Sequence, residues 1–164
     1  MDNNPFTVHK IDHLSASSIN LWVTDPCRWC LKYLMKIDSD YGASAQRGHI
    51  IEWALERWLA KGDIVTAKEL EEVFIKHLID KQIDVEAGKA VEEIKNLMPY
   101  YDMVHANCNY PNLVNYQEKV EVQYGDLPIP IIGYIDFVFD DFILDLKTTS
   151  KMPSICPETV KRQM

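Results

Sequence analysis

The spacing of hydrophobic residues changes near Asn112, from a helical period to a strand-like alternation. Upstream of it, apolar side chains recur three or four positions apart, which is the spacing of one helix face. This pattern predicts helices that begin at Ser15, 27, 44, Thr66 and 85. The helix that begins at 44 is expected to end at 61, and the helix that begins at 85 is expected to end at 107. Pro99 lies inside the last of these helices and should kink or split it. The chain is therefore expected to be helical over 15–107.

Downstream of this point the pattern indicates β-strands joined by short polar turns. The expected strands are 114–124, 129–139 and 142–148. Turns at Gly125-Asp126 and at Asp140-Asp141 are expected to join them. The last two strands are apolar on both faces, which predicts a sheet covered on both sides by helices. We therefore expect a single α/β domain over 1–164, with a β-rich core at 112–149 and the start of a final helix at 157–164.

The last hairpin is expected to place two carboxylates face to face. Folding the chain about Asp140-Asp141 brings Asp136 opposite Asp145, and Lys147 shares the face of Asp145 because side chains alternate along a strand. Like charges directly opposed across strands are destabilising, so this apolar hairpin needs a compensating cation. A divalent metal is suitable because hard cations bind carboxylate oxygens. Lys147 suits a general base or a stabiliser of transition-state charge, or it neutralises Asp145 at the surface.

A third ligand should come from the predicted helix 44–61. Glu52 lies inside the apolar stripe of this helix, beside Ile51 and Leu55, which is unexpected for a solvated residue. His49 precedes it by one helical turn on a similar face. Either side chain could reach a metal, and either could equally be an ordinary surface group.

Charge and composition narrow the classes of function. The net charge of −8 argues against a simple electrostatic nucleic-acid binder. It is compatible with an enzyme that acts on nucleic acid, since metals offset the charge of acidic ligands. No apolar run is long enough to cross a bilayer, and the N-terminus lacks the features of a signal peptide. We expect a cytoplasmic protein that does not contact membranes.

The four cysteines, Cys27, Cys30, Cys108 and Cys156, are expected to be reduced, ordinary half-buried thiols. The Cys27-x-x-Cys30 spacing suits a metal, but a zinc or iron–sulfur site needs more ligands than this pair supplies. The alternative is a structural metal cluster that all four cysteines share.

The hairpin sequence resembles a known catalytic motif. Gly133-x-x-Asp136 followed by Asp145-Leu146-Lys147-Thr148-Thr149 is similar to the core motif of the PD-(D/E)XK nuclease superfamily. Within that superfamily the RecB-type and phage exonuclease branch is the most similar. Its N-terminal helix resembles Leu14–Ile19 with Pro26–Trp29, its first-helix motif resembles Gly48-x-x-x-Glu52, and its Gln-x-x-x-Tyr motif resembles the segment starting at Gln163.

This resemblance implies a restriction-endonuclease-like fold, a mixed central sheet flanked by helices. It implies metal-dependent hydrolysis of phosphodiester bonds in DNA by an exonuclease of phage or recombination and repair type, with DNA and a phage recombination or replication protein as partners. The location would then be the cytoplasm, the host's if the gene belongs to a phage. The alternative is a catalytically inactive nuclease-fold module, or a fragment of one, that binds DNA or a partner.

The resemblance also assigns roles to residues. One or two Mg²⁺ or Mn²⁺ ions would be bound by Glu52 in preference to His49, Asp136, Asp145 and the backbone carbonyl of Leu146. Lys147 would complete the catalytic set. The substrate would be contacted by Thr148, Thr149 and Gln163.

Two features depart from the branch. Its members with an iron–sulfur cluster place three cysteines after the glutamine motif, and this chain has none there. Cys27 and Cys30 alone do not support such a cluster. The sequence also stops at Met164, before the tyrosine of the motif and the last helix and strand of the fold, which leads us to expect a truncated C-terminus.

Overall fold

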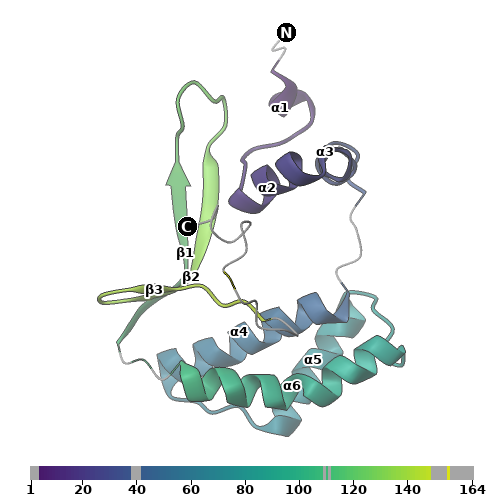
Figure 1. Ribbon diagram of the computed structural model, residues 1–164, viewed down its shortest axis with the longest axis vertical. Coiled ribbons are helices and arrows are strands. Elements are labelled where there is room, and N and C mark those ends of the chain that lie inside the picture. Colours follow the sequence, from purple (N-terminus) through teal and green to yellow (C-terminus); the bar gives the residue numbers. More distant parts are fainter. Residues whose placement is uncertain (1–3, 38–41, 109, 111, 149–154, 156–164) are drawn as a thin grey trace. The chain divides into compact units, whose positions relative to one another are not determined.

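The computed structural model describes residues 4–37, 42–108, 110, 112–148 and 155 (Figure 1). These residues form an α/β structure with two compact units. One unit comprises 1–39, 118–135 and 150–164, and the other comprises 40–117 and 136–149. The expectation of a single domain stays a prediction. The expected final helix at 157–164 lies outside the described residues.

The first unit contains the N-terminal helices. They are α1 (Pro5–Val8), α2 (Ala16–Thr24), α3 (Pro26–Trp29) and the π-helix η1 (Cys30–Leu34). The start of α2 is a capping box, in which Ser15 and Ser18 each bond the other's backbone N–H through their side chains. Asp25 ends α2, and its side chain caps α3 by accepting from the backbone N–H of Arg28. The helix starts predicted at Ser15 and at 27 thus agree with the structure to within about one residue.

The second unit is built on three helices, α4 (Ala43–Lys61), α5 (Ala67–Asp80) and α6 (Gly88–Asn107), which pack side by side in Figure 1. All three were predicted, with boundaries within a few residues. Gly62 ends α4 in the left-handed conformation, at φ 71°, which glycine adopts without a Cβ clash. Thr66 caps α5 by accepting from the backbone N–H of Glu69.

Pro99 does not split α6, which runs unbroken from Gly88 to Asn107. The proline is exposed, whereas Leu97 and Tyr101 on either side of it are buried in the core. Their burial offsets the backbone hydrogen bond that a proline removes. The predicted split at Pro99 is therefore wrong, and the alternative, a kink, stays a prediction.

The core of the second unit lies between the helices and the hairpin. Its largest fully buried side chains are Tyr101, Phe74, Phe137, Ile51, Leu55, Leu70, Leu78, Leu97 and Val65. Of these side chains, Phe137 lies on the sheet. The apolar stripe read from the sequence of α4 is the face that packs into the core.

A buried ion pair lies within the helical layer. The guanidinium of Arg47 on α4 donates to the carboxylate of Glu93 on α6, which also accepts from the hydroxyl of Ser44. Arg47 and Glu93 are only 4% and 8% exposed. The guanidinium also stacks on the ring of Tyr100, 4.0 Å from its centroid. These contacts join α4 to α6 next to Gly48.

The sheet has three described strands, β1 (Leu113–Val122), β2 (Ile131–Phe139) and β3 (Ile143–Leu144), in the order β1-β2-β3. β2 and β3 are antiparallel, with Phe137 opposite Leu144 and Val138 opposite Ile143. The backbone N–H of Phe139 donates to the carbonyl of Phe142 over 2.9 Å, which closes a turn at Asp140-Asp141. The predicted hairpin and its register are therefore confirmed. A parallel bridge between Leu14 and Ile131 makes the pairing mixed.

Two details of the sheet differ from the prediction. β3 ends at Leu144 instead of continuing to Thr148, because the backbone N–H of Leu146 bonds the side chain of Asp136 rather than a strand neighbour. Tyr134 and Ile143 are 59% and 63% exposed, so the expectation that both faces are covered is not met at these residues. Aromatic and β-branched side chains are favoured in strands even on a solvated face.

Among the helices that the structure describes, none has the length and apolar character needed to cross a membrane.

Candidate active site

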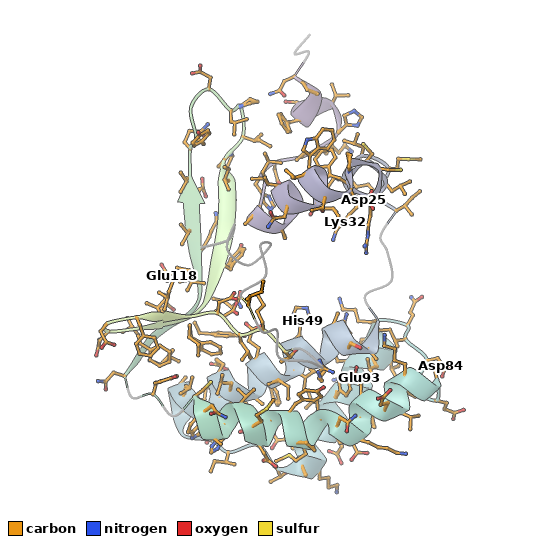
Figure 2. All side chains as sticks on the ribbon, viewed as in Figure 1. Asp25, Lys32, His49, Asp84, Glu93 and Glu118 are labelled. Carbon is orange, nitrogen blue, oxygen red and sulfur yellow. The ribbon has the colours of Figure 1, made fainter. Side chains whose placement is uncertain are left out.

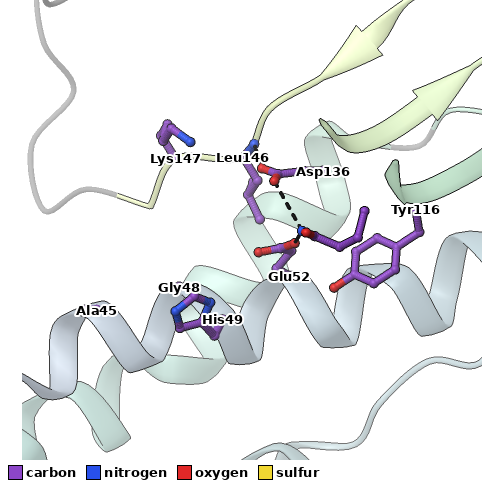
Figure 3. A pocket seen from close by; sticks show the side chains of 9 residues that line it. Ala45, Gly48, His49, Glu52, Tyr116, Asp136, Leu146 and Lys147 are labelled. Carbon is purple, nitrogen blue, oxygen red and sulfur yellow. Dashed lines mark hydrogen bonds between the residues drawn. The ribbon is translucent and has the colours of Figure 1, made fainter. Parts of the chain in front are cut away.

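In the second unit, an open pocket lies between α4, the strands β1 and β2, and the segment that follows β3 (Figure 3). Its lining residues come from α4, β1, β2 and the segment after β3, and they are Ala45, Gly48, His49, Glu52, Tyr116, Gln117, Asp136, Leu146 and Lys147. Five of them, His49, Glu52, Asp136, Leu146 and Lys147, are residues for which the sequence predicted a role. The remaining predicted ligand, Asp145, does not line the pocket.

Helix α4 supplies one wall of the pocket through its helical period. Gly48, His49 and Glu52 lie within about one turn of one another and line the pocket, while Ile51 and Leu55 are fully buried in the core. His49 is exposed and projects from α4 on the side away from α5 and α6 (Figure 2). Glu52 is partly buried.

Two carboxylates from distant parts of the sequence share one amide. The side-chain nitrogen of Gln117 donates to Oε1 of Glu52 and lies 3.4 Å from Oδ1 of Asp136 (Figure 3). Burial raises the pKa of the Glu52 carboxyl, and the nearby charge of Asp136 raises this pKa further. Hydrogen bonds from Gln117 and Tyr116 only partly oppose the rise. The pocket thus holds a partly desolvated pair of like charges.

Asp136 is fixed by the segment that follows β3. The backbone N–H of Leu146 donates to Oδ2 of Asp136 over 2.8 Å. Burial raises the pKa of Asp136, the hydrogen bond from Leu146 lowers it, and the neighbouring Asp145 raises it again. The effect of Asp145 on the pKa of Asp136 agrees with the predicted proximity of the two aspartates. In the hairpin Phe137 lies opposite Leu144, so the next pair in this register is Asp136 with Asp145.

The side chains of Asp145 and Lys147 form an ion pair. Nζ of Lys147 lies 2.7 Å from Oδ1 of Asp145, and the side chains of Lys147 and Asp145 are 52% and 50% exposed. The sequence placed these residues on one face, and their contact agrees with that. An exposed pair of this kind contributes little to stability, so both groups are available for other partners.

The donor set suits a hard divalent cation, because it consists of the carboxylate oxygens of Glu52 and Asp136. Glu52 and Asp136 carry like charges that a cation would offset, which is the fit expected of metal ligands. Within the described part of the chain, no three His, Cys, Asp or Glu side chains gather into a complete metal site. The structure thus brings together Glu52 and Asp136 and leaves Asp145 paired with Lys147.

The approach of the segment after β3 to α4 depends on a glycine. A Cβ at Gly48 would lie 3.1 Å from Oγ1 of Thr148, which is closer than most real Cβ contacts. Thr148 therefore passes close to α4 at the edge of the pocket. The other two predicted substrate contacts, Thr149 and Gln163, lie outside the described residues.

Sequence reasoning missed Tyr116 and Gln117, which both reach the pocket from β1. The pKa of Tyr116 is raised by burial and by the charge of Glu52. The available signal was a run of polar residues, Asn115 to Glu118, inside an otherwise strand-like pattern. That run shows polar character but does not reveal which side chains turn toward α4.

The cysteines that the structure describes are free thiols. Cys27 is exposed, Cys30 is partly buried, and Cys108 is buried, which raises the pKa of its thiol. Cys156 lies outside the described residues. Of these three, only Cys30 has the half-buried environment that was expected, and the choice between ordinary thiols and a shared cluster stays a prediction.

A comparison of the sequence with models of protein families finds a match that covers most of the chain. The family model of the PD-(D/E)XK nuclease superfamily matches residues 13–163. The chain belongs to the PD-(D/E)XK nuclease superfamily. Neither a search of curated proteins nor a search of solved structures finds a significant match.

Membership of the PD-(D/E)XK superfamily confirms the resemblance read from the hairpin. It also agrees with the α/β fold, in which a helix faces a hairpin that carries the motif. The match concerns the superfamily as a whole. Nuclease activity in general is what this family suggests, and nucleic acid is the substrate that such a fold implies.

Proposed function

We propose that this chain is a Mg²⁺- or Mn²⁺-dependent deoxyribonuclease, and more specifically an exonuclease. The observation that carries the proposal is the pairing of Glu52 with Asp136 in an open pocket, beside Leu146 and Lys147. The resemblance of the sequence to the superfamily motif supports a catalytic role for these groups. Helix α4 supplies one carboxylate and β2 the other, so only the folded chain assembles the pair.

Glu52 and Asp136 would hold the metal, with Asp145 and the backbone carbonyl of Leu146 as further ligands. A bound divalent cation supplies Lewis acidity toward the scissile phosphate and lowers the pKa of water. The half-burial of both carboxylates strengthens their attraction for a cation, since partial exclusion of water lowers the local dielectric constant.

Lys147 would act on the substrate through its ammonium group. An ammonium group donates hydrogen bonds and accepts none, and the ammonium group of Lys147 contacts the carboxylate of Asp145. This supports stabilisation of negative charge on the phosphoryl oxygens in preference to proton abstraction from water. Asp145 would orient the ammonium group until substrate arrives.

The choice of substrate and mode of cleavage follows from the RecB-type and phage-type features of the sequence. Gly48-x-x-x-Glu52 and the N-terminal segment support an exonuclease that acts on DNA in recombination or repair. Thr148, Thr149 and Gln163 would contact the DNA, a phage recombination or replication protein would be a partner, and the cytoplasm would be the location.

The experiment that tests the proposal incubates the purified chain with linear and with circular DNA, each with Mg²⁺, Mn²⁺ or EDTA. Cleavage of linear DNA that requires a metal, with closed circles left intact, is the expected result. Cutting of closed circles would replace the exonuclease with an endonuclease. Stabilisation by Mn²⁺ without cleavage of either DNA would overturn the enzyme and favour an inactive binding module.

A further inference from the structure

Gln117 has an unusual backbone conformation for a residue within a strand. Its φ is +51°, inside β1, which runs from Leu113 to Val122. A side chain other than glycine in this left-handed region meets steric strain, and residues of this kind cluster at functional sites. The strand continues on both sides of Gln117, so the feature is a local irregularity of the kind found at β-bulges.

The consequence of this conformation is that two consecutive side chains reach the same pocket. Successive residues of a regular strand point to opposite faces. Tyr116 and Gln117 nevertheless both line the pocket beside Glu52. Both are partly buried, as is Glu118, so the burial pattern of β1 also loses its alternation here.

The chemistry of the Gln117 amide suits its position between two carboxylates. Ionised carboxylates only accept hydrogen bonds, whereas the amide nitrogen carries two N–H donors. This nitrogen donates to Glu52 and lies 3.4 Å from Asp136. A neutral donor therefore holds two like-charged groups close together without neutralising either of them.

We propose that Gln117 is a positioning residue, which fixes Glu52 and Asp136 relative to each other so that they bind a divalent cation together. This inference rests on the proposed function, because it deepens the account of the same metal site. Removing a residue that hydrogen-bonds to a metal ligand and orients it typically lowers the affinity for the metal by about 10- to 100-fold. The left-handed backbone conformation of Gln117 directs its side-chain amide toward Glu52 and Asp136.

The proposal predicts opposite effects on folding and on metal binding. Asn and Gly adopt positive φ more readily than Gln, so either substitution relieves the backbone at this position. The amide of Asn is one methylene too short to reach both carboxylates from the same backbone, and Gly has no amide at all. A residue that served only the fold would lose stability on substitution, in contrast with the behaviour expected of Gln117.

The test measures Mn²⁺ binding by titration calorimetry and the melting temperature in EDTA for Gln117→Asn and Gln117→Gly. For both variants, a Kd at least about tenfold higher than the parent's is expected, with a melting temperature that is unchanged or raised. The matched control is Gln123→Asn, because the Gln123 amide donates to the backbone carbonyl of Leu127, outside the pocket. The control should bind Mn²⁺ as the parent does.

An Mn²⁺ affinity within twofold of the parent in either variant would overturn the role of Gln117 while leaving the proposed nuclease standing. A lowered melting temperature in both variants would also overturn it, because Gln117 would then be a structural residue. A parent chain that binds no Mn²⁺ at all would refute the metal-dependent function and this inference together.

Discussion

The backbone N–H of Leu146 donates a hydrogen bond to the carboxylate of Asp136 over 2.8 Å. This contact joins the segment after β3 to β2 at the position where another ladder bond would otherwise form. It restrains the side chain of Asp136 and holds Leu146 and Lys147 in the lining of the pocket. One side-chain-to-backbone bond thus sets the positions of three groups that the proposed chemistry requires.

Asp136→Asn should remove Mn²⁺-dependent cleavage without unfolding the chain. The asparagine carbonyl still accepts from Leu146, so the segment stays in place, but the negative charge that attracts the cation is lost. Its melting temperature in EDTA should equal or exceed that of the parent, because the repulsion with Glu52 disappears. Asp136→Ala, by contrast, leaves the N–H of Leu146 without its partner and should cost about 1 kcal/mol in urea unfolding. Full activity of Asp136→Asn would contradict the assignment of Asp136 as a ligand.

The metal-free chain should become less stable as the pH rises from about 4. The pKa values of Glu52 and Asp136 are raised above their ordinary values of 4.5 and 3.8. The folded state therefore holds more protons than the unfolded state between the ordinary and the raised values. This contribution to stability is fully present below the ordinary values and is lost once the pH passes the raised ones.

Urea unfolding in EDTA across this pH range measures that effect. The double variant Glu52→Gln with Asp136→Asn should lack this component of the pH dependence. A parent and a double variant with the same pH profile would show that the two carboxyls titrate normally in the folded chain.

Lys147→Ala should lower metal-dependent cleavage by about 100-fold or more, because it removes the ammonium group that faces the developing charge. Its stability should change by less than about 1 kcal/mol, since the ion pair with Asp145 is exposed. Asp145→Asn should likewise keep the fold and lose cleavage. Rates measured on linear DNA and melting curves measured on the same preparations check both parts, and undiminished rates in both variants would remove these residues from the mechanism.

Glu93→Ala should destabilise the helical layer by about 3–5 kcal/mol, because it leaves the buried guanidinium of Arg47 without its counter-charge. Glu92→Ala is the matched control, since Glu92 is the exposed neighbour on α6 and its loss should cost less than about 0.5 kcal/mol. Urea unfolding of the two variants measures the difference. Equal effects would mean that the ion pair contributes nothing beyond helix propensity.

Gly48→Ala should raise the melting temperature and lower the rate of cleavage. Alanine is favoured over glycine within a helix by about 1 kcal/mol. The added methyl group, however, meets Oγ1 of Thr148 at 3.1 Å and displaces the segment that carries Lys147. Gly88→Ala is the control, because nothing lies within 4 Å of its Cβ position on α6. A Gly48→Ala variant as active as the control would argue against close packing of this segment during catalysis.

Much of the architecture could be predicted because its causes are local. A two-residue turn fixes the register of a hairpin, so the approach of Asp136 and Asp145 followed from counting residues. The place of Glu52 within an apolar stripe likewise marked it as unusual from the sequence pattern alone. The helix starts predicted at Ser15 and at 27 also depend on nearby residues, since the side chains of Ser15 and Asp25 cap these helices.

What the sequence did not reveal depends on contacts between distant segments. The left-handed backbone of Gln117 has no signature in residue type, because glutamine has no preference for that region. The end of β3 depends on a bond between Leu146 and a side chain ten residues earlier, which strand propensity does not include. Pro99 remained inside α6 because burial on both sides outweighed its cost, and only tertiary packing decides that balance.

Helix α4 places the fully buried Ile51 next to Glu52, so the same turn of backbone belongs both to the interior and to the pocket wall. Any compound that occupies the pocket in the folded state alone will raise the temperature at which the helical layer melts. Ligands and inhibitors of this protein can accordingly be sought by heat denaturation, with no need for a cleavage assay.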